Sequence, residues 1–412
     1  MNLTYAGSFR LPRNYGAGNE GFAFGGKPLA FNPAANSLFV GTKDHKLAEV
    51  LIPALGQGPL EQLPFAGLKQ NFTDPFDGTL EQAGDTLAGV MVDGDALVVS
   101  ASIFYDANNT QRVGHYRRPI DLSQPGPKVW HGVGDPKKQG FLAGYMAPFG
   151  DGRALTGQAG VPVITRTSYG PNAWLFDPKL QDLSVKPLVY YDEAHQTLGP
   201  WQGSNELFGA TTKISGVASV DGQLVFLGTN GVGAFGYGPG VSNPDDPRIG
   251  THPLDEMGKP ILSETFCYDP TSDDKGQHAY PYRYQLWVYD KILASDPWAN
   301  IPRVQVLEFP TPPINIYATG GLAWDAQSRI LYMSQLQADR DGYSYRAVIH
   351  AYKVEAAGSP SPELDKLTAE IAWLNQQVAF WKEQAQTSRL ELDAFRTKAA
   401  ELKQALQILL NF

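Results

Sequence analysis

The stretch at residues 214–229, ISGVASVDGQLVFLGT, contains the pattern that decides the fold of this 412-residue chain. A strand that starts with small residues leads through an Asp-Gly turn into a second, continuously apolar strand, which is typical of a β-hairpin. Similar hairpins are predicted at 29–42, 87–102 and 320–334, and a degenerate copy, LAGYMAPFGDGRALTG, occupies 142–157. Five copies of one hairpin predict a repeat architecture.

Each hairpin is followed by a third predicted strand, and four of them by a fourth. The third strands are LAEVLIP (47–53), VGHYRRPID (113–121), NAWLFDP (172–178), YQLWVYD (284–290) and AVIHAYKVE (347–355). The fourth strands are EQLPFAGL (61–68), KVWHGV (128–133), VKPLVYY (185–191) and RVQVLEFP (303–310). The last unit has none, and LTYAGSFRLP (3–12) at the chain start supplies it. The sequence therefore predicts an all-β fold over residues 1–354, a five-bladed β-propeller closed by its N-terminal strand.

An insertion at about 235–281 interrupts the fourth unit and is rich in Pro, Gly and Asp. Long insertions in repeat folds form loops, often on a binding face, and the lack of paired apolar strands argues against a sixth blade. Tyrosines with one arginine near its end offer flat apolar area with polar tips for a sugar or peptide. Ordinary strand packing is the alternative, and the one we favour. The candidate ligand-binding residues are His278, Tyr280, Tyr282, Arg283 and Tyr284.

The C-terminal part changes character after a predicted linker at 355–362. Residues 363–412 contain neither Gly nor Pro and carry seven unbroken heptads, which predict an α-helical coiled coil that makes a homo-oligomer. A trimer is favoured over a dimer, because Trp381 and Phe395 need wide layers. A single amphipathic helix packed on the propeller is the alternative, but its apolar stripe would drift by about 20° per heptad. The predicted oligomerisation residues are Leu364, Leu367, Ile371, Leu374, Val378, Trp381, Leu392, Phe395, Leu402, Leu406 and Leu409.

Charge and composition exclude several classes of partner. The net charge is −9, the sequence pI is about 5.3 and no basic stripe occurs, so we expect no nucleic-acid partner. No run of about 18 apolar residues exists, and the first residues lack the regions of a secretory signal, so we expect neither a membrane span nor a signal peptide. The single cysteine, Cys267, cannot form an internal disulfide and has no cysteine partner for a zinc site.

Aspartates recur directly after the first strand of four units. A ring of carboxylates around a channel would resemble five-bladed glycosidases, but the tight-turn interpretation is favoured because Asp and Gly supply the turn geometry. The four aspartates are Asp93, Asp151, Asp221 and Asp325.

Two further aspartates, Asp339 and Asp341, are candidate calcium ligands. No complete loop with a terminal Glu follows them, so a polar loop is the favoured interpretation. No strained nucleophile turn of the form Gly-x-Ser-x-Gly and no phosphate-binding Gly-Lys-Ser/Thr loop occur. We therefore predict no catalytic residue, no metal site and no cofactor.

Three segments resemble a group of uncharacterised propeller-like proteins from bacteria and their phages: SLFVGTKDHKLAEVLIP (37–53), KGQHAYPYRYQLWVYD (275–290) and GGLAWDAQSRILYMSQ (320–335). The resemblance covers roughly residues 20–355 and brings no catalytic residues with it. A propeller with a stalk, low charge and abundant Tyr, Asn and Gly is similar to a bacteriophage virion component, such as a fibre, appendage or capsid decoration. The functional inference from this resemblance rests on an analogy between folds.

The resemblance implies an oligomeric structural protein of the virion, made in the host cytoplasm, whose partners are other virion proteins. The first alternative is a propeller that binds carbohydrate on a host surface, with a surface glycan as its partner. The second alternative is a polysaccharide-cleaving enzyme, which requires two carboxylates within about 5–10 Å of each other.

Overall fold

The structure is a computed structural model, and it describes residues 1–13, 21–160, 167–191, 206–290, 292, 299–314, 316–355 and 398. The chain divides into two compact units. The first comprises Met1 and Leu3–Val354, and it ends where the predicted linker begins. Every predicted oligomerisation residue from Leu364 to Leu409 lies outside the described residues, as does the whole predicted coiled coil except Lys398.

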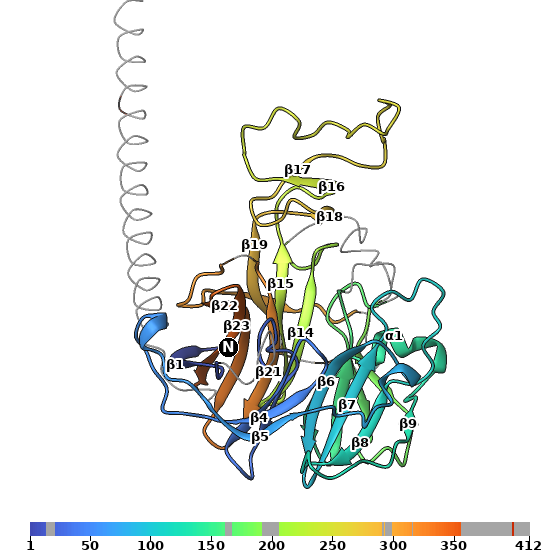
Figure 1. Cartoon of the computed structure of the whole chain (residues 1–412), viewed down its shortest axis with the longest axis vertical. Coiled ribbons are helices and arrows are strands. Elements are labelled where there is room, and N and C mark those ends of the chain that lie inside the picture. Colours follow the sequence, from blue (N-terminus) through green and yellow to red (C-terminus); the bar gives the residue numbers. More distant parts are fainter. Residues whose placement is uncertain are drawn as a thin grey trace, which may run out of the picture. The chain divides into compact units, whose positions relative to one another are not determined.

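Within the described residues, the first unit contains five four-stranded antiparallel sheets (Figure 1). The strands of the first sheet are β2 (Leu29–Asn32), β3 (Ser37–Gly41), β4 (Leu47–Leu51) and β5 (Gly67–Thr73). Those of the second are β6 (Thr86–Asp93), β7 (Ala96–Ser102), β8 (His115–Pro119) and β9 (Trp130–His131). Those of the third are β10 (Tyr145–Gly150), β11 (Arg153–Gly157), β12 (Ala173–Phe176) and β13 (Lys186–Val189).

The last two sheets show how the insertion and the chain start enter the fold. The strands of the fourth sheet are β14 (Lys213–Val220), β15 (Gln223–Gly231), β19 (Tyr282–Tyr289) and β20 (Arg303–Leu307). Those of the fifth are β21 (Thr319–Asp325), β22 (Ile330–Asp341), β23 (Ser344–Val354) and β1 (Leu3–Arg10). Because β1 pairs with β23 from Leu3↔Val354 to Arg10↔Val348, the N-terminal strand completes the last sheet, as the sequence predicts.

The second strand of each sheet contains an apolar stretch that is buried on both faces of the sheet. Side chains alternate across a strand. In β7, Leu97 and Val99 pack towards the first sheet, and Val98 packs towards the third. In β15, Val225 contacts the fifth sheet, whereas Phe226 contacts the third. Each sheet thus contributes to two hydrophobic cores, one on either side of it.

The five main cores follow the sheets in a closed cycle, first to second and onward until the fifth meets the first. The first strands of the sheets, β2, β6, β10, β14 and β21, likewise pack on one another in this order, and β21 returns to β2. Sheets that stand around a common centre with their first strands innermost form a β-propeller.

A register shift recurs near the start of three first strands, between Leu87 and Gly89, Ile214 and Gly216, and Thr319 and Gly321. The skipped residues in the first two are Ala88 and Ser215, and both line the central cavity described below. Such bulges redirect a side chain and often stand next to functional sites. The following glycine lets neighbouring sheets approach closely, because a Cβ on Gly89 would lie 2.0 Å from the carbonyl oxygen of Gly144.

Two predictions about local structure are wrong. Residues 61–68 do not form the fourth strand, because Leu60–Gln62 is a 3₁₀ turn (η1) and β5 begins at Gly67, after Pro64. The insertion is not only a loop. It contains a small three-stranded sheet, the insertion sheet, whose strands are β16 (Gly236–Val241), β17 (Cys267–Tyr268) and β18 (Lys275–His278). It extends beyond the ends of β15 and β19 (Figure 1).

The helical segments that lie wholly within the described residues are short. They are η1 (Leu60–Gln62), η2 (Leu80–Gln82), η3 (Pro136–Lys138) and α1 (Gln139–Leu142).

Candidate functional site

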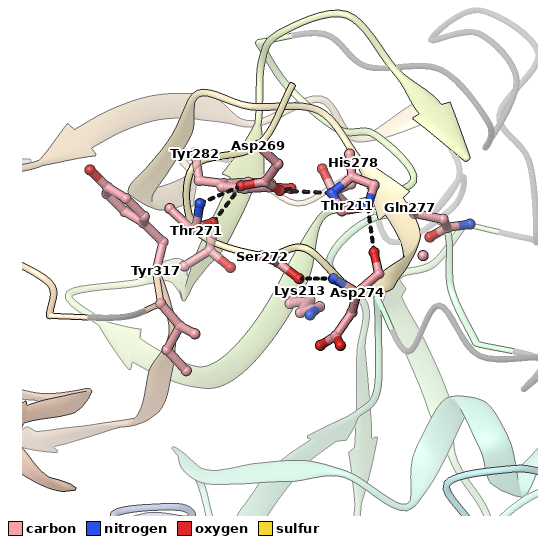
Figure 2. A pocket seen from close by; sticks show the side chains of 13 residues that line it. Thr211, Lys213, Asp269, Thr271, Ser272, Asp274, Gln277, His278, Tyr282 and Tyr317 are labelled. Atoms are coloured by element: carbon pink, nitrogen blue, oxygen red, sulfur yellow. Dashed lines mark hydrogen bonds and ion pairs between the residues drawn. The ribbon is translucent and has the colours of Figure 1, made fainter. Parts of the chain in front are cut away.

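Two cavities adjoin at the end of the propeller that carries the insertion. One, of about 220 Å³, is lined by the insertion together with β14 and β15, and the other, of about 320 Å³, lies where the first strands begin. Lys213 and Thr229 line both. The first cavity, called the insertion pocket, contains two of the predicted binding residues, His278 and Tyr282 (Figure 2).

Asp269 is the centre of the hydrogen-bond network in the insertion pocket (Figure 2). Its Oδ2 lies 2.8 Å from Nδ1 of His278 and accepts a hydrogen bond of 2.7 Å from the Tyr282 hydroxyl. Its Oδ1 accepts hydrogen bonds from the backbone N–H (2.9 Å) and the hydroxyl (2.6 Å) of Thr271. Asp269 directly follows β17, His278 ends β18 and Tyr282 begins β19, so the insertion sheet brings the three side chains together.

The network moves the pKa values of the two charged groups apart. Burial raises the pKa of Asp269, but hydrogen bonds from His278, Thr271 and Tyr282 outweigh it and lower this pKa from 3.8 to about 2. Burial lowers the pKa of His278, but the hydrogen bond and the charge of Asp269 outweigh it and raise this pKa above 6.5. Both side chains are almost fully buried, and the Asp269 carboxylate and the His278 ring lie 2.8 Å apart inside the insertion.

His278 has both ring nitrogens engaged. Nδ1 faces Asp269, and Nε2 lies 3.1 Å from the carbonyl oxygens of Gly238 and Asp274. An imidazolium that donates from both nitrogens offers no lone pair to a metal or to a substrate proton. His278 therefore positions the insertion sheet, and the exposed side chains of Lys213 and Asp274 are the charged groups open to the pocket.

The remaining three predicted residues lie outside the pocket lining. Tyr280 packs edge-to-face on Tyr268, with ring centroids 5.3 Å apart. Arg283 forms an exposed ion pair of 2.6 Å with Glu206. Tyr284 is buried in the core between the fourth and fifth sheets, where packing is its role. The structure thus brings His278 and Tyr282 together but does not join all five into one binding surface.

Each of the four recurring aspartates has a partner, which is local for Asp151 and Asp325 and lies on another strand or sheet for Asp93 and Asp221. Asp151 and Asp221 have positive φ values of 47° and 50°, the left-handed conformation that tight turns require. The partners are three arginine side chains and one turn N–H, in the pairs Asp93–Arg117, Asp151–Arg153, Asp221–Arg329 and Asp325–Gln327.

The candidate calcium ligands are paired with arginines. Asp339 is buried and lies 2.7 Å from Arg13, and Asp341 lies 2.8 Å from Arg346. Across the described ranges, no group of three or more His, Cys, Asp or Glu side chains is placed to hold a metal ion. A search of the same ranges finds no helix that is long and apolar enough to span a membrane.

Sequence reasoning missed Asp269, Thr271 and Lys213 as pocket residues. The run DPTSDD at 269–274 was a usable signal, because an Asp followed two residues later by Thr is typical of an Asx turn next to a strand. No local signal marks Lys213, because most of the cavity lining around it comes from other sheets.

No protein-family model and no curated protein matches the sequence. Among solved structures, the β-propeller domain of Myceliophteria thermophila Cps50 (Swd1) is similar, with 10% identity, a TM-score of 0.30, and coverage of 86% of this chain and 100% of that one. The PQQ domain of pyranose dehydrogenase from Coprinopsis cinerea has 9% identity, a TM-score of 0.33 and coverage of 80% and 93%. The WD40 β-propeller domain of Doa1 has 9% identity, a TM-score of 0.32 and coverage of 86% and 97%.

Proposed function

We propose that the chain is an oligomeric binding protein, a five-bladed propeller that meets its target with the end carrying the insertion. The count of five blades is supported by the five four-stranded sheets of the described residues and by the cycle of their first strands. The observation that carries the binding role is the pair of adjoining cavities that share Lys213 and Thr229 where the insertion meets the propeller. Concave sites with a few placed polar groups are the usual ligand sites of folded domains.

The C-terminal heptads add assembly to this function. The proposal is that residues 363–412 form a parallel coiled coil, with three strands favoured over two, that holds several propellers together. Several heads on one stalk raise the avidity for a surface without any new contact. Together with the resemblance to phage proteins, this supports a structural or attachment role in a virion.

The experiment that tests assembly is light scattering on the full chain and on a chain cut after Gly358. We expect a trimer, or else a dimer, for the full chain and a monomer for the cut one. A full-length variant with Leu374→Asp and Leu392→Asp should also be monomeric, because a charge at a core position is desolvated on assembly. Gln376→Glu lies outside the predicted a and d positions and should leave the mass unchanged. If the full chain is monomeric, self-assembly is wrong.

Glycan binding is the second candidate, and a tyrosine cluster at the insertion pocket favours it. Tyr282 and Tyr317 line the pocket with ring centroids 6.3 Å apart, and Tyr280 packs against Tyr282. Such rings offer apolar area with polar tips. Tyr317→Ala should abolish binding to a glycan array, whereas Tyr343→Ala, at a site that is 96% exposed and outside the pocket, should not. Equal binding by both variants would contradict a glycan site here.

A further inference from the structure

The second cavity lies at one mouth of the central channel. Its lining takes residues from all five sheets: Lys27 before β2, Thr86 from β6, Tyr145 from β10, Lys213 from β14 and Thr319 from β21. All of these stand at or just before the start of a first strand. The cavity therefore opens on the centre of the ring and is called the channel mouth.

Two ammonium groups dominate the charge of the described lining of the channel mouth. Its described lining contains Lys27 and Lys213 but no Asp or Glu. Neither lysine side chain has an ion pair or a hydrogen bond within the described part of the chain. Both lysines keep an exposed side chain. Partial desolvation by the protein atoms around the mouth lowers the pKa of both, and the charge of Lys213 lowers that of Lys27 further. The two like charges repel each other, and an anion bound between them would offset this repulsion.

Uncharged polar groups complete the lining. Ser215, which the bulge in β14 places there, shares a hydrogen bond of 2.7 Å with Thr319. Gln158 is 6% exposed, and its buried amide oxygen has no hydrogen-bond partner among the described residues. Its side-chain amide makes no hydrogen bond to any described residue. Gln158 therefore offers a hydrogen-bonding group to a ligand at this mouth.

The opposite mouth has a different chemistry. A cavity of about 340 Å³ is formed there by the far ends of the same first strands. Large apolar side chains line it, among them Phe31, Met91, Met146 and Trp324. The two lysines therefore distinguish this end of the channel from the other end, and they do not belong to the pattern that repeats from sheet to sheet.

We propose that the channel mouth binds an oxyanion, the carboxylate of an acidic sugar or a phosphate group, between Lys27 and Lys213. Ammonium groups form charge-assisted hydrogen bonds with either group, and hydroxyls such as that of Ser215 supply further partners. At about 320 Å³ the cavity falls within the range of small-molecule sites. The inference needs neither the coiled coil nor a virion.

The test is isothermal titration calorimetry of the full chain with two probes, inorganic phosphate and glucuronate, at low ionic strength. The variants are Lys27→Met and Lys213→Met, which remove the charge and keep most of the length. Lys353→Met, on an exposed position of β23, is the matched control. We expect one probe molecule per chain, roughly tenfold or greater weakening in each channel variant, and wild-type affinity in the control. Binding of phosphate alone identifies a phosphoryl ligand, and stronger binding of glucuronate identifies an acidic sugar.

Thermal unfolding separates a binding role from a structural one. Lys27→Met and Lys213→Met should unfold at the wild-type temperature or above it, because each removes charge repulsion. Lys27→Arg keeps the charge and should keep most of the affinity. The proposal is overturned if neither probe binds, if Lys353→Met weakens binding as much as the channel variants, or if Lys27→Arg loses binding while it remains folded.

Discussion

At the scale of single residues, the Asp269–His278 pair shows how the insertion orders itself without a large core. Asp269 has a lowered pKa, so its contribution to stability is present above pH 3.8 and is lost as the pH falls towards 2. His278 has a raised pKa, so its contribution is present below pH 6.5 and is lost as the pH rises through that raised pKa. The insertion sheet should therefore be most stable between these limits.

Asp269→Asn tests this pair directly. Without the carboxylate charge, the pKa of His278 should fall by about one unit or more, because an opposite charge within a few ångströms favours the imidazolium. The pKa is measured by NMR titration of the His278 ring protons. Asp274→Asn is the control, since Asp274 contacts His278 through its carbonyl oxygen and not its carboxylate. An unchanged titration in Asp269→Asn would show that the ion pair does not exist in solution.

Glu49 is the buried charge of the first sheet, and four side chains hold it. It accepts hydrogen bonds from Asn32 (2.8 Å), Lys69 (2.9 Å), Gln70 (2.6 Å) and Ser37. Burial raises its pKa, but these bonds outweigh burial and lower it from 4.5. Its contribution to stability is therefore present above pH 4.5 and is lost in acid.

Glu49→Ala should lower the free energy of unfolding by about 2–4 kcal/mol, because it leaves several buried donors without an acceptor. Glu49→Gln, which keeps one acceptor oxygen, should cost less. Asn71→Ala, at an exposed position of β5, should change stability by less than about 0.5 kcal/mol. Urea unfolding measures all three, and an equal effect of Glu49→Ala and Asn71→Ala would contradict the role given to Glu49.

At the scale of elements, three first strands carry a glycine that closely approaches the neighbouring sheet: Gly89, Gly216 and Gly321. Gly89→Ala should destabilise the protein by about 1–3 kcal/mol or more, because the new Cβ would meet the carbonyl oxygen of Gly144 at 2.0 Å. Gly67→Ala, in β5, is the matched control, since a Cβ there meets nothing within 4 Å. It should be neutral or stabilise by up to about 1 kcal/mol. The unfolding temperatures of the two variants test this prediction. An unchanged unfolding temperature for Gly89→Ala would mean that the sheets can move apart without loss of stability.

At the scale of the whole propeller, closure depends on pairing the first strand with the last. Deletion of residues 1–10 removes β1 and leaves the edge of β23 open. We expect a large fall in unfolding temperature and aggregation detected by light scattering, because an open strand edge recruits other chains.

A circular permutant separates the loss of β1 from the disturbance of a chain end. It opens the chain in the turn at Asp151 and Gly152 and joins the old start to residue 355 through a flexible linker, without residues 356–412. It keeps β1 in its sheet and should remain folded and monomeric. Aggregation of the permutant, or full stability of the deletion variant, would argue against closure by this strand.

Features that local periodicity encodes could be predicted from the residues alone. These are the five hairpins, the apolar second strands, the turn aspartates and the strand at the chain start that completes the last sheet, because alternation and turn chemistry act over a few residues. Short-range reasoning placed one fourth strand wrongly at 61–68, and it missed the insertion sheet, whose strands are short and poor in apolar residues.

Only the tertiary structure decided which side chains meet. Asp269 reaches His278 because the insertion sheet brings β17 and β18 to the start of β19. Lys27 and Lys213 share one cavity because the ring brings the first and fourth sheets to a common centre. Contacts between residues this far apart in the chain depend on how the sheets pack and close, and no periodicity in the sequence records that.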